Sequence, residues 1–470
     1  MTPTFFFYDL ETFGLSPKED RIAQFAGIRT DADFNIIGEP INIYCKPPED
    51  YIPDPESILI TGITPQEADE KGVSEAEFAK RIHQEFAVPD TCILGYNSIR
   101  FDDEMIRYLF YRNFIDPYAY SWQNGNSRWD LLDVVRATYA FRPEGINWPT
   151  DENGAQSFKL ENLSKANNLA HDKAHDALSD VYATIGMAQL IKEKQPRLFD
   201  YYYNHRRARD LNNLVDLRQL TPLLHVSGMF GQARNNLSMI MPILFNPHNK
   251  NELITIDLMG DISGILTLDA PTIREKMYTK AADLPEGEAR IPIKGIHLNK
   301  CPILATIALL KTMPAQILDD KKCLENYQAL MNAKELIQSK LFEIYQTPPS
   351  FDNDSHSAPV ESQLYHGFFE RSDRKQMDLI PEMSGAELLN YDFEFHDPRA
   401  TSLLFIYRAR NFFESLFEDE KEDWKRYTLM KREYFKKSYQ PKFEALLLEA
   451  HQAKADEKIQ CLESIAQFYQ

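Results

Sequence analysis

The sequence predicts a mixed α/β domain, followed by a β-rich domain and then an all-helical domain. Strand-like and helix-like stretches alternate over residues 1–196, which is typical of α/β structure. From residue 197, short β-type segments bounded by turn residues predominate. After a stretch rich in Pro, Ser and Asp, apolar residues recur every three or four positions. We therefore predict domains at 1–196, 197–350 and 364–470, with a linker at 351–363.

The first domain is expected to contain a mixed sheet with flanking helices. Apolar runs end at turn residues or acids, which indicates strands at 5–10, 21–31, 34–47 and 92–97. Two further stretches carry apolar residues at helical spacing, 74–87 and 104–114.

The second and third domains differ from the first in their periodicity. β-type segments lie at 222–230, 236–247, 252–261 and 289–299, with a hairpin turn expected at 247–251 and a helical stretch at 325–345. A small barrel or sandwich is the natural interpretation. In the third domain the apolar spacing predicts helices at 403–417, 424–435, 443–453 and 458–469.

Charge and cysteine content exclude several classes of protein. The 470 residues carry 52 basic and 71 acidic side chains, a net charge of −19, which argues against a protein that coats nucleic acid through bulk charge. A nucleic-acid partner would need a local basic and aromatic groove. The five cysteines form no C-x-x-C pair, so neither zinc nor a disulfide framework is indicated. With no signal-like start and no long apolar run, we predict a cytoplasmic protein that does not contact membranes.

Asp9 and Glu11 stand two residues apart at the end of the first predicted strand. Side chains at this spacing point to the same face of a strand, so both carboxylates are aimed at one point. They repel each other unless one is protonated or a cation is bound, and hard oxygen ligands suit Mg²⁺ or Mn²⁺. Because D-x-E is also a common polar strand end, the pair alone leaves both interpretations open.

A further acid follows the predicted strand 92–97, where the chain enters a helix. Asp102 or Asp103 could cap that helix, which is the ordinary role of aspartate at such a position. The functional alternative is that Asp102 adds a third carboxylate to the cluster.

A third acidic position lies in the helix predicted after residue 176. Its apolar stripe buries one face and consists of Ala177, Val181, Thr184, Ile185 and Ala188. Asp180 adjoins this stripe, and a carboxylate beside a buried face needs a partner, for which a metal is one candidate. We expect Asp176 to cap the helix and His175 to precede it on a loop, free to lean over the site. Spacing alone leaves Asp172 and Asp176 as rival ligands, and an ordinary polar role for His175.

Three short motifs carry a resemblance to a known superfamily. Asp9-Leu10-Glu11-Thr12, then NSIRFD ending at Asp102, then His175-x4-Asp180 resemble, in order, the three motifs of the DEDD exonucleases, which include polymerase proofreading domains. The tyrosine subclass would have Tyr at position 176, where this chain has Asp, so the chain resembles the histidine subclass. The resemblance assigns the third acid to Asp102 and not to Asp103.

A wider resemblance covers nearly the whole chain. The stretches YCKPPEDYIPDP, ITGITPQEA, SRWDLLDV, HVSGMFG and YRARNF are similar to the bacterial exodeoxyribonuclease I family. That family has an RNase H-like nuclease domain, an SH3-like barrel domain and a helical C-terminal domain, in agreement with the organisation predicted above. The resemblance implies processive 3′ to 5′ removal of 5′-mononucleotides from single-stranded DNA, in DNA repair and recombination.

The resemblance also implies how such a site would work. Two Mg²⁺ ions, for which Mn²⁺ can substitute, would be held by Asp9, Glu11, Asp102 and Asp180. His175 would take the proton from the attacking water, a task that suits its ordinary pKa near neutrality. Four carboxylates balance two divalent cations, so the loaded site would not repel a phosphate.

Binding a single strand requires aromatic rings and a basic groove. The candidates for substrate contact, beside Glu11, are Arg107, Tyr118, Trp122, Arg136 and Lys159. Packing is the ordinary alternative for each of the two aromatic residues. The family has an arginine near the position of Lys159, and lysine does not make the bidentate phosphate contact of an arginine.

The family further implies a protein partner, the acidic and hydrophobic C-terminal tail of single-stranded DNA-binding protein. Arg142 and Lys311 are candidate anchors for it, and we expect a monomer. Two alternatives stay open: a DEDD nuclease that acts on RNA ends or proofreads, and an inactive adaptor that binds single strands. The complete set of motifs weighs against the adaptor.

Overall fold

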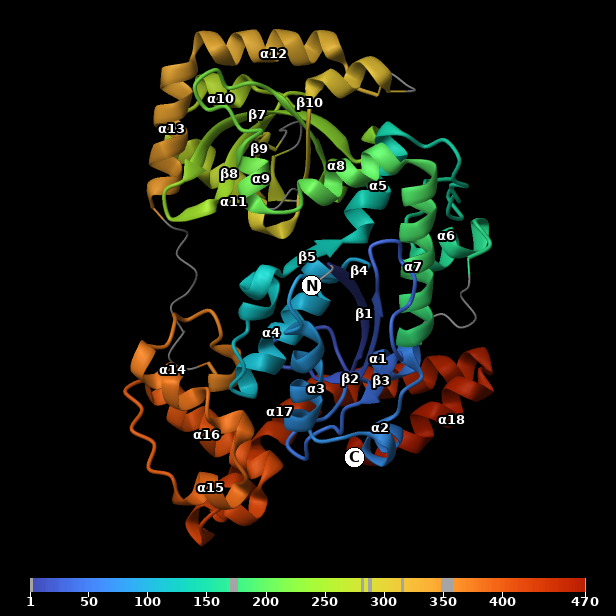
Figure 1. The fold of residues 1–470 in the computed structure, drawn as a ribbon, viewed down its shortest axis with the longest axis vertical. Helices are drawn as coiled ribbons and strands as arrows, with labels where there is room; N and C mark the ends of the chain where they lie inside the picture. The colour runs from blue at the N-terminus through green and yellow to red at the C-terminus, as the bar shows by residue number, and fades with distance from the viewer. Residues whose placement is uncertain are drawn as a thin grey trace. The chain divides into compact units, whose positions relative to one another are not determined.

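The protein folds into two compact units, each assembled from segments that are distant in the sequence (Figure 1). The computed structural model describes residues 3–169, 176–279, 283–285, 290–313, 317–347 and 358–469. The first unit comprises residues 1–127, 170–185 and 352–470, and the second comprises 128–169 and 186–351. The three kinds of structure predicted from the sequence follow one another along the chain as expected.

A five-stranded mixed sheet forms the centre of the α/β part. Its strands run in the order β3-β2-β1-β4-β5, and they are β1 (Thr4–Thr12), β2 (Ile22–Thr30), β3 (Ile41–Tyr44), β4 (Thr91–Gly95) and β5 (Ser127–Asp130). β1 pairs with β2 in antiparallel and with β4 in parallel orientation. The central position of β1 explains why its apolar run is buried almost throughout.

Helices α3 (Glu75–Phe86) and α4 (Asp102–Arg112) pack on one face of this sheet. Phe6, Tyr8 and Leu10 of β1 contribute to that core together with apolar residues of both helices. Successive side chains of a strand alternate between faces, so the odd-numbered positions 9 and 11 project from the other face. Shorter helices α1 (Pro55–Thr61) and α2 (Pro65–Lys71) precede α3, and α7 (Ala177–Lys194) begins in this unit.

The C-terminal part of the first unit is helical, as predicted, but the two helices expected at 424–435 and 443–453 are one continuous helix. Its helices are α14 (Arg371–Met377), α15 (Gly385–Asn390), α16 (Pro398–Asn411), α17 (Glu418–Ala453) and α18 (Asp456–Ile465). Phe435, Phe443 and Tyr469 pack in one core with Phe13 and Tyr51 of the α/β part. The N-terminal and C-terminal segments therefore share a hydrophobic core.

Buried ion pairs join the same two segments. Glu361 accepts hydrogen bonds from Arg21 Nη2 at 3.0 Å and from Arg410 Nη1 at 2.6 Å. Arg410 also donates to Asp50 Oδ2 at 2.6 Å. Burial alone would raise the pKa of Glu361, but the guanidinium groups of Arg410 and Arg21 hold that pKa well below its usual range. The charges are thus paired inside the unit, where an unpaired buried charge would lower the free energy of unfolding.

An antiparallel five-stranded sheet dominates the second unit, in the order β10-β6-β7-β8-β9. Its strands are β6 (Leu223–Val226), β7 (Leu237–Asn246), β8 (Asn249–Asp257), β9 (Ile293–His297) and β10 (Ile303–Thr306). β7 and β8 form the predicted hairpin, with its turn at 247–248. The predicted helical stretch at 325–345 is divided into α12 (Asp320–Asn332) and α13 (Lys334–Gln346).

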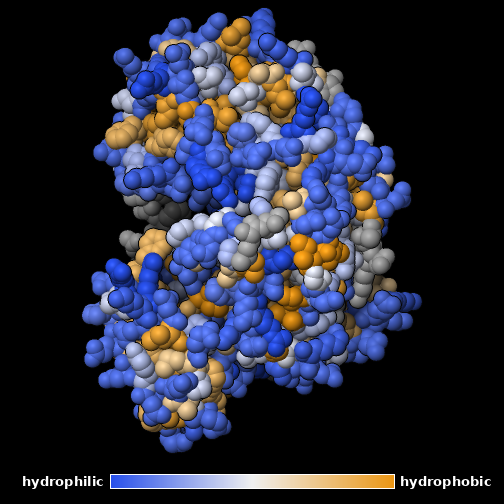
Figure 2. Space-filling model, viewed as in Figure 1, coloured by the Kyte–Doolittle hydropathy of each residue, from blue (hydrophilic) through white to orange (hydrophobic). Residues whose placement is uncertain are grey.

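Further helices of the second unit come before and between these strands. They are α5 (Leu131–Phe141), α6 (Leu160–Ala166), α8 (Pro196–Asn204), α9 (Ala208–Asn212), α10 (Ser263–Thr267) and α11 (Ala270–Tyr278). Most of the face shown in Figure 2 is hydrophilic, with scattered apolar patches. Within the described part of the chain, no helix has both the length and the apolar character needed to cross a bilayer.

Candidate metal centre

Strand β1 carries two carboxylates on the sheet face away from α3 and α4. Asp9 lies opposite Ala26 of β2, and Glu11 lies opposite Gln24. Their neighbours Tyr8 and Leu10 are in the core on the other face, so strand alternation alone sends both acids to the same side. This placement agrees with the sequence prediction.

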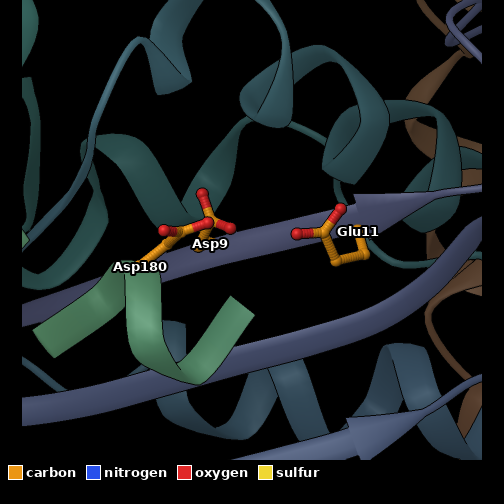
Figure 3. A group of neighbouring side chains, drawn as sticks. All are labelled: Asp9, Glu11 and Asp180. Atoms are coloured by element: carbon orange, nitrogen blue, oxygen red, sulfur yellow. The ribbon is translucent and has the colours of Figure 1, made fainter. Parts of the chain in front are cut away.

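Helix α7 brings Asp180 to the same point. One carboxylate oxygen from each of Asp9, Glu11 and Asp180 lies within 4.8 Å of the others (Figure 3). The beginning of α7 is held by Asp176, whose Oδ1 accepts a hydrogen bond from the Leu178 amide at 3.1 Å, as predicted for a helix cap. The buried side chain of Val181 anchors the adjoining face of the helix.

Asp102 is the first residue of α4 and lies beside this cluster. Its side chain is buried, and after desolvation its charge is the largest contribution that raises the pKa of Asp9. Neither Asp102 nor Asp103 caps α4: the N-cap residue is Phe101, and no side-chain cap is present among the described residues. Asp103 instead accepts a hydrogen bond from the Tyr8 hydroxyl. Of the two roles considered for Asp102, the helix cap is wrong, and a place in the carboxylate cluster stays a prediction.

The carboxylates strongly perturb one another's protonation. Burial, and then the charges of Asp102, Glu11 and Asp180, raise the pKa of Asp9 well above its usual range. Burial, followed by the charges of Asp180 and Asp176, raises the pKa of Glu11 to about 8. Buried acids that face one another without a cation favour the protonated form. An all-oxygen donor set of this kind fits a hard divalent cation.

Two of the residues expected to bind DNA in the first unit, Arg107 and Tyr118, contact other side chains of the protein. Arg107 of α4 donates to Glu104 Oε1 at 2.9 Å and to the Tyr365 hydroxyl at 3.3 Å, and its guanidinium lies 5.3 Å from the Tyr118 ring centre. Tyr118 is only half-buried, so its packing role leaves part of the ring accessible. Trp122 follows a short 3-10 turn and is 64 % exposed. Of the two aromatic residues, Trp122 is the more available to a ligand.

The other positions predicted from the sequence lie in the second unit or outside the residues that the structure describes. Arg136 and Lys159 belong to the second unit, where Arg136 pairs with Asp133 at 2.8 Å and Lys159 is exposed at the start of α6. His175 and Asp172 lie outside the described residues.

Sequence reasoning did not identify two aromatic residues near Arg107. Tyr365 Oη donates to Glu104 at 2.5 Å, and the ring of Phe368 lies 6.0 Å from that of Tyr118. Both rings are exposed, at 52 % and 77 %. No local spacing connects residues near 110 with residues near 365; the only signal was the aromatic content of the stretch YHGFF.

Comparison with known proteins covers the chain almost completely. Residues 6–188 match the exonuclease family, residues 206–347 the exonuclease I SH3-like domain, and residues 358–470 the exonuclease I C-terminal domain. Exodeoxyribonuclease I of Haemophilus influenzae is 48% identical over 99% of this chain and 98% of its own length. Exodeoxyribonuclease I of Escherichia coli is 52% identical over 90% of this chain and 88% of its own length.

Solved structures of exonuclease I, the first two below from E. coli, agree with this assignment. The complex with a dA16 oligonucleotide superposes with a TM-score of 0.92 at 48% identity and covers 99% of both chains. A zinc-bound complex with single-stranded DNA superposes with a TM-score of 0.92 at 48% identity and covers 99% of this chain and 98% of the other. A structure of SSB/exonuclease I with an inhibitor superposes with a TM-score of 0.90 at 46% identity. It covers 100% of this chain and 99% of the other. The chain belongs to the exodeoxyribonuclease I family.

Proposed function

We propose that this chain is a metal-dependent exonuclease that degrades single-stranded DNA from its 3′ end to 5′-mononucleotides. The observation that carries the proposal is the cluster of Asp9, Glu11 and Asp180, with Asp102 beside it. The E. coli relative solved with a dA16 oligonucleotide supports single-stranded DNA as the substrate.

Asp9, Glu11, Asp102 and Asp180 would hold the divalent cations, with Mg²⁺ as the proposed physiological metal and Mn²⁺ as a substitute. When bound, the cations supply charge neutralisation at the scissile phosphate and acidify water. The chain provides ionised carboxylates at fixed positions, and Glu11 would also contact the terminal nucleotide. Because Asp9 and Glu11 have raised pKa values, protons compete with the cation, so metal affinity should increase with pH.

The general base of the proposed reaction is His175. This assignment rests on the resemblance of His175-x4-Asp180 to the third motif of the histidine subclass of DEDD exonucleases. We expect His175→Ala to reduce turnover about 10²- to 10⁴-fold while metal and DNA binding persist. Single-turnover cleavage and DNA-binding measurements on the same preparation test this, and a wild-type rate would refute the assignment.

One experiment separates the proposal from its alternatives. Purified protein is incubated with end-labelled single-stranded DNA, duplex DNA and RNA of matched sequence, with Mg²⁺ or with EDTA. The proposal requires stepwise release of mononucleotides from the 3′ end of the single-stranded DNA, only with Mg²⁺. Preference for RNA would favour a nuclease acting on RNA ends. Binding without cleavage would favour an adaptor.

A pocket in the second unit supports the proposed partner, the tail of single-stranded DNA-binding protein. The cavity has a volume of about 560 Å³, and Arg142, Arg197, Tyr201 and Leu309 are among the residues that line it. Two guanidinium groups beside apolar side chains suit an acidic, hydrophobic peptide. Arg142 is held by the Thr312 carbonyl at 2.6 Å, and Lys311 is the neighbouring residue of η8 (Ile307–Thr312).

The partner assignment has its own test. Arg142→Glu should abolish binding of the tail peptide, and binding to the wild type should weaken with salt. Cleavage of free single-stranded DNA should be unaffected. Peptide affinity that survives the charge reversal would contradict the assignment.

The predicted domain boundaries, the monomeric state and the cytoplasmic location stay predictions. The two compact units do not coincide with the boundaries 1–196, 197–350 and 364–470. Sedimentation of the purified protein tests the monomer.

A further inference from the structure

We propose that Tyr8 and Asp103 form a positioning pair that holds the Asp102 carboxylate beside Asp9 for cation binding. The inference rests on the proposed metal-dependent function. Tyr8 directly precedes Asp9 in β1, and Asp103 directly follows Asp102 in α4. Each member of the pair is therefore the covalent neighbour of a candidate metal ligand.

A single hydrogen bond joins the pair across 95 residues of sequence. The Tyr8 hydroxyl donates to Asp103 Oδ1 at 2.7 Å, and the two residues are 2 % and 1 % exposed. A hydrogen bond to a carboxylate is stronger than one between neutral groups. Burial keeps water from replacing either partner.

The pair lies on the sheet face opposite the candidate ligands of β1. Tyr8 is in the core under α4, packed with Met105 and Ile106 of that helix, whereas Asp9 projects to the other face. The hydrogen bond thus attaches the first turn of α4 to the central strand. Asp102 stands one residue before the attachment point, at the start of α4, and its side chain is buried.

The beginning of α4 lacks a side-chain cap within the described part of the chain. Its N-cap residue Phe101 has φ −127° and ψ −67°, and no capping side chain is present among the described residues. The preceding turn η1 (Ser98–Arg100) starts after Asn97, which has a left-handed φ of 66°. Where no side chain caps a helix start, a long-range hydrogen bond can help to set the position of its first residues.

Ring packing of Tyr8 is a competing explanation. Its ring contacts those of Phe25 and Phe86, with centroid distances of 6.1 and 5.2 Å. Tyr8→Phe keeps these contacts and removes only the hydroxyl, so it separates the two explanations. Tyr108→Phe is the matched control: Tyr108 is also buried, it lies on α4, and within the described part of the chain its hydroxyl has no hydrogen-bond partner.

The test measures Mn²⁺ binding to the full-length, DNA-free protein by electron paramagnetic resonance. We expect about tenfold weaker Mn²⁺ binding for Tyr8→Phe, the loss typical of removing a group that orients a metal ligand, and no change for Tyr108→Phe. In cleavage assays the Mn²⁺ dependence of Tyr8→Phe should shift by the same factor. The KM for DNA should stay at the wild-type value, and saturating Mn²⁺ should restore kcat.

Wild-type Mn²⁺ affinity in Tyr8→Phe would overturn the inference, as would equal weakening in Tyr108→Phe. If circular dichroism shows that Tyr8→Phe does not fold, Asp103→Asn takes its place, and unchanged affinity there overturns the inference. In the double variant the two losses should not add, because both break the same bond. Failure of the proposed function is distinguishable: the wild type would then bind no Mn²⁺, or Asp9→Asn would bind it normally.

Discussion

Glu11 combines deep burial with a function that requires charge. Its carboxyl has a pKa of about 8 in the folded protein, against an ordinary value of 4.5. The metal-free folded state therefore holds this proton more tightly than the unfolded chain does. The contribution of the protonated Glu11 carboxyl to the stability of the metal-free fold is fully present below about pH 4.5. It is lost as the pH rises through about 8.

This shift predicts a pH-dependent difference between the wild type and Glu11→Gln. In EDTA, the Tm of the wild type should fall more steeply than that of the variant between about pH 5 and pH 9, because only the wild type must ionise Glu11 in addition to the other acids of the cluster. Mg²⁺ should recover the loss in the wild type and have a smaller effect on the variant. Thermal denaturation followed by circular dichroism checks this, and parallel Tm curves in EDTA would contradict it.

Residue-level prediction succeeded where a short-range rule was sufficient. The period of a strand placed Asp9 and Glu11 on the same face. The apolar stripe placed Asp180 only beside the buried face of its own helix, and the family resemblance selected it over Asp172 and Asp176. The choice between Asp102 and Asp103 came from the family resemblance, because both acids stand at the same helix start. The bond from Tyr8 to Asp103 was not predictable, since no local pattern connects residues 95 positions apart.

Among the secondary-structure elements, α3 begins with a side-chain cap. Ser74 is its N-cap, and the side-chain oxygen of Ser74 accepts the Glu77 amide at 3.3 Å. We expect Ser74→Ala to lower the free energy of unfolding by about 1 kcal/mol and to leave cleavage unchanged. Urea denaturation measures the first quantity.

The control for that prediction is Ser438→Ala, an exposed position inside α17. Alanine is the better helix former there, so no loss of stability is expected. Equal destabilisation by both variants would show that capping is not the cause.

Periodicity predicted the existence and type of most elements, and the errors arose where it is interrupted. The helical stretch at 325–345 is two helices, because the chain turns at Ala333. The capping rule gave a wrong prediction at the beginning of α4. An aspartate at a helix start is usually a cap, but here Asp103 accepts a hydrogen bond from the distant Tyr8. Local rules cannot include a partner supplied by another element.

At the scale of the whole molecule, Glu361 connects the two terminal segments of the first unit through Arg21 and Arg410. Glu361→Gln removes the negative charge that pairs with these two buried guanidinium groups. The free energy of unfolding should therefore fall by about 3–5 kcal/mol. Since the pKa of Glu361 is lowered, its contribution should be present above about pH 4.5 and disappear as the pH falls through the folded value. Urea denaturation at pH 7 and at low pH measures both effects.

Glu370→Gln provides a matched surface control, because Glu370 is exposed. Its effect on the free energy of unfolding should stay within about 0.5 kcal/mol. If Glu361→Gln is equally mild, the buried network does not hold the segments together.

The composition of the region around Glu361 does not indicate that this residue is buried. Residues 351–363 were expected to form a linker because they are rich in Pro, Ser and Asp, yet Glu361 is buried in η10 (Val360–Ser362). A composition rule detects the absence of an apolar period, and it cannot detect a single acid that pairs with arginines far away in the sequence.

The shared core of the first unit has a consequence for biosynthesis. Arg21 leaves the ribosome 340 residues before its partner Glu361, and Phe13 precedes Phe435 by a still longer stretch. Residues 128–169 and 186–351 are translated in between and belong to the other compact unit. The nascent α/β segment must therefore wait, with part of its apolar surface uncovered, until the late helices are made. During that interval, the uncovered apolar surface makes this segment prone to aggregation.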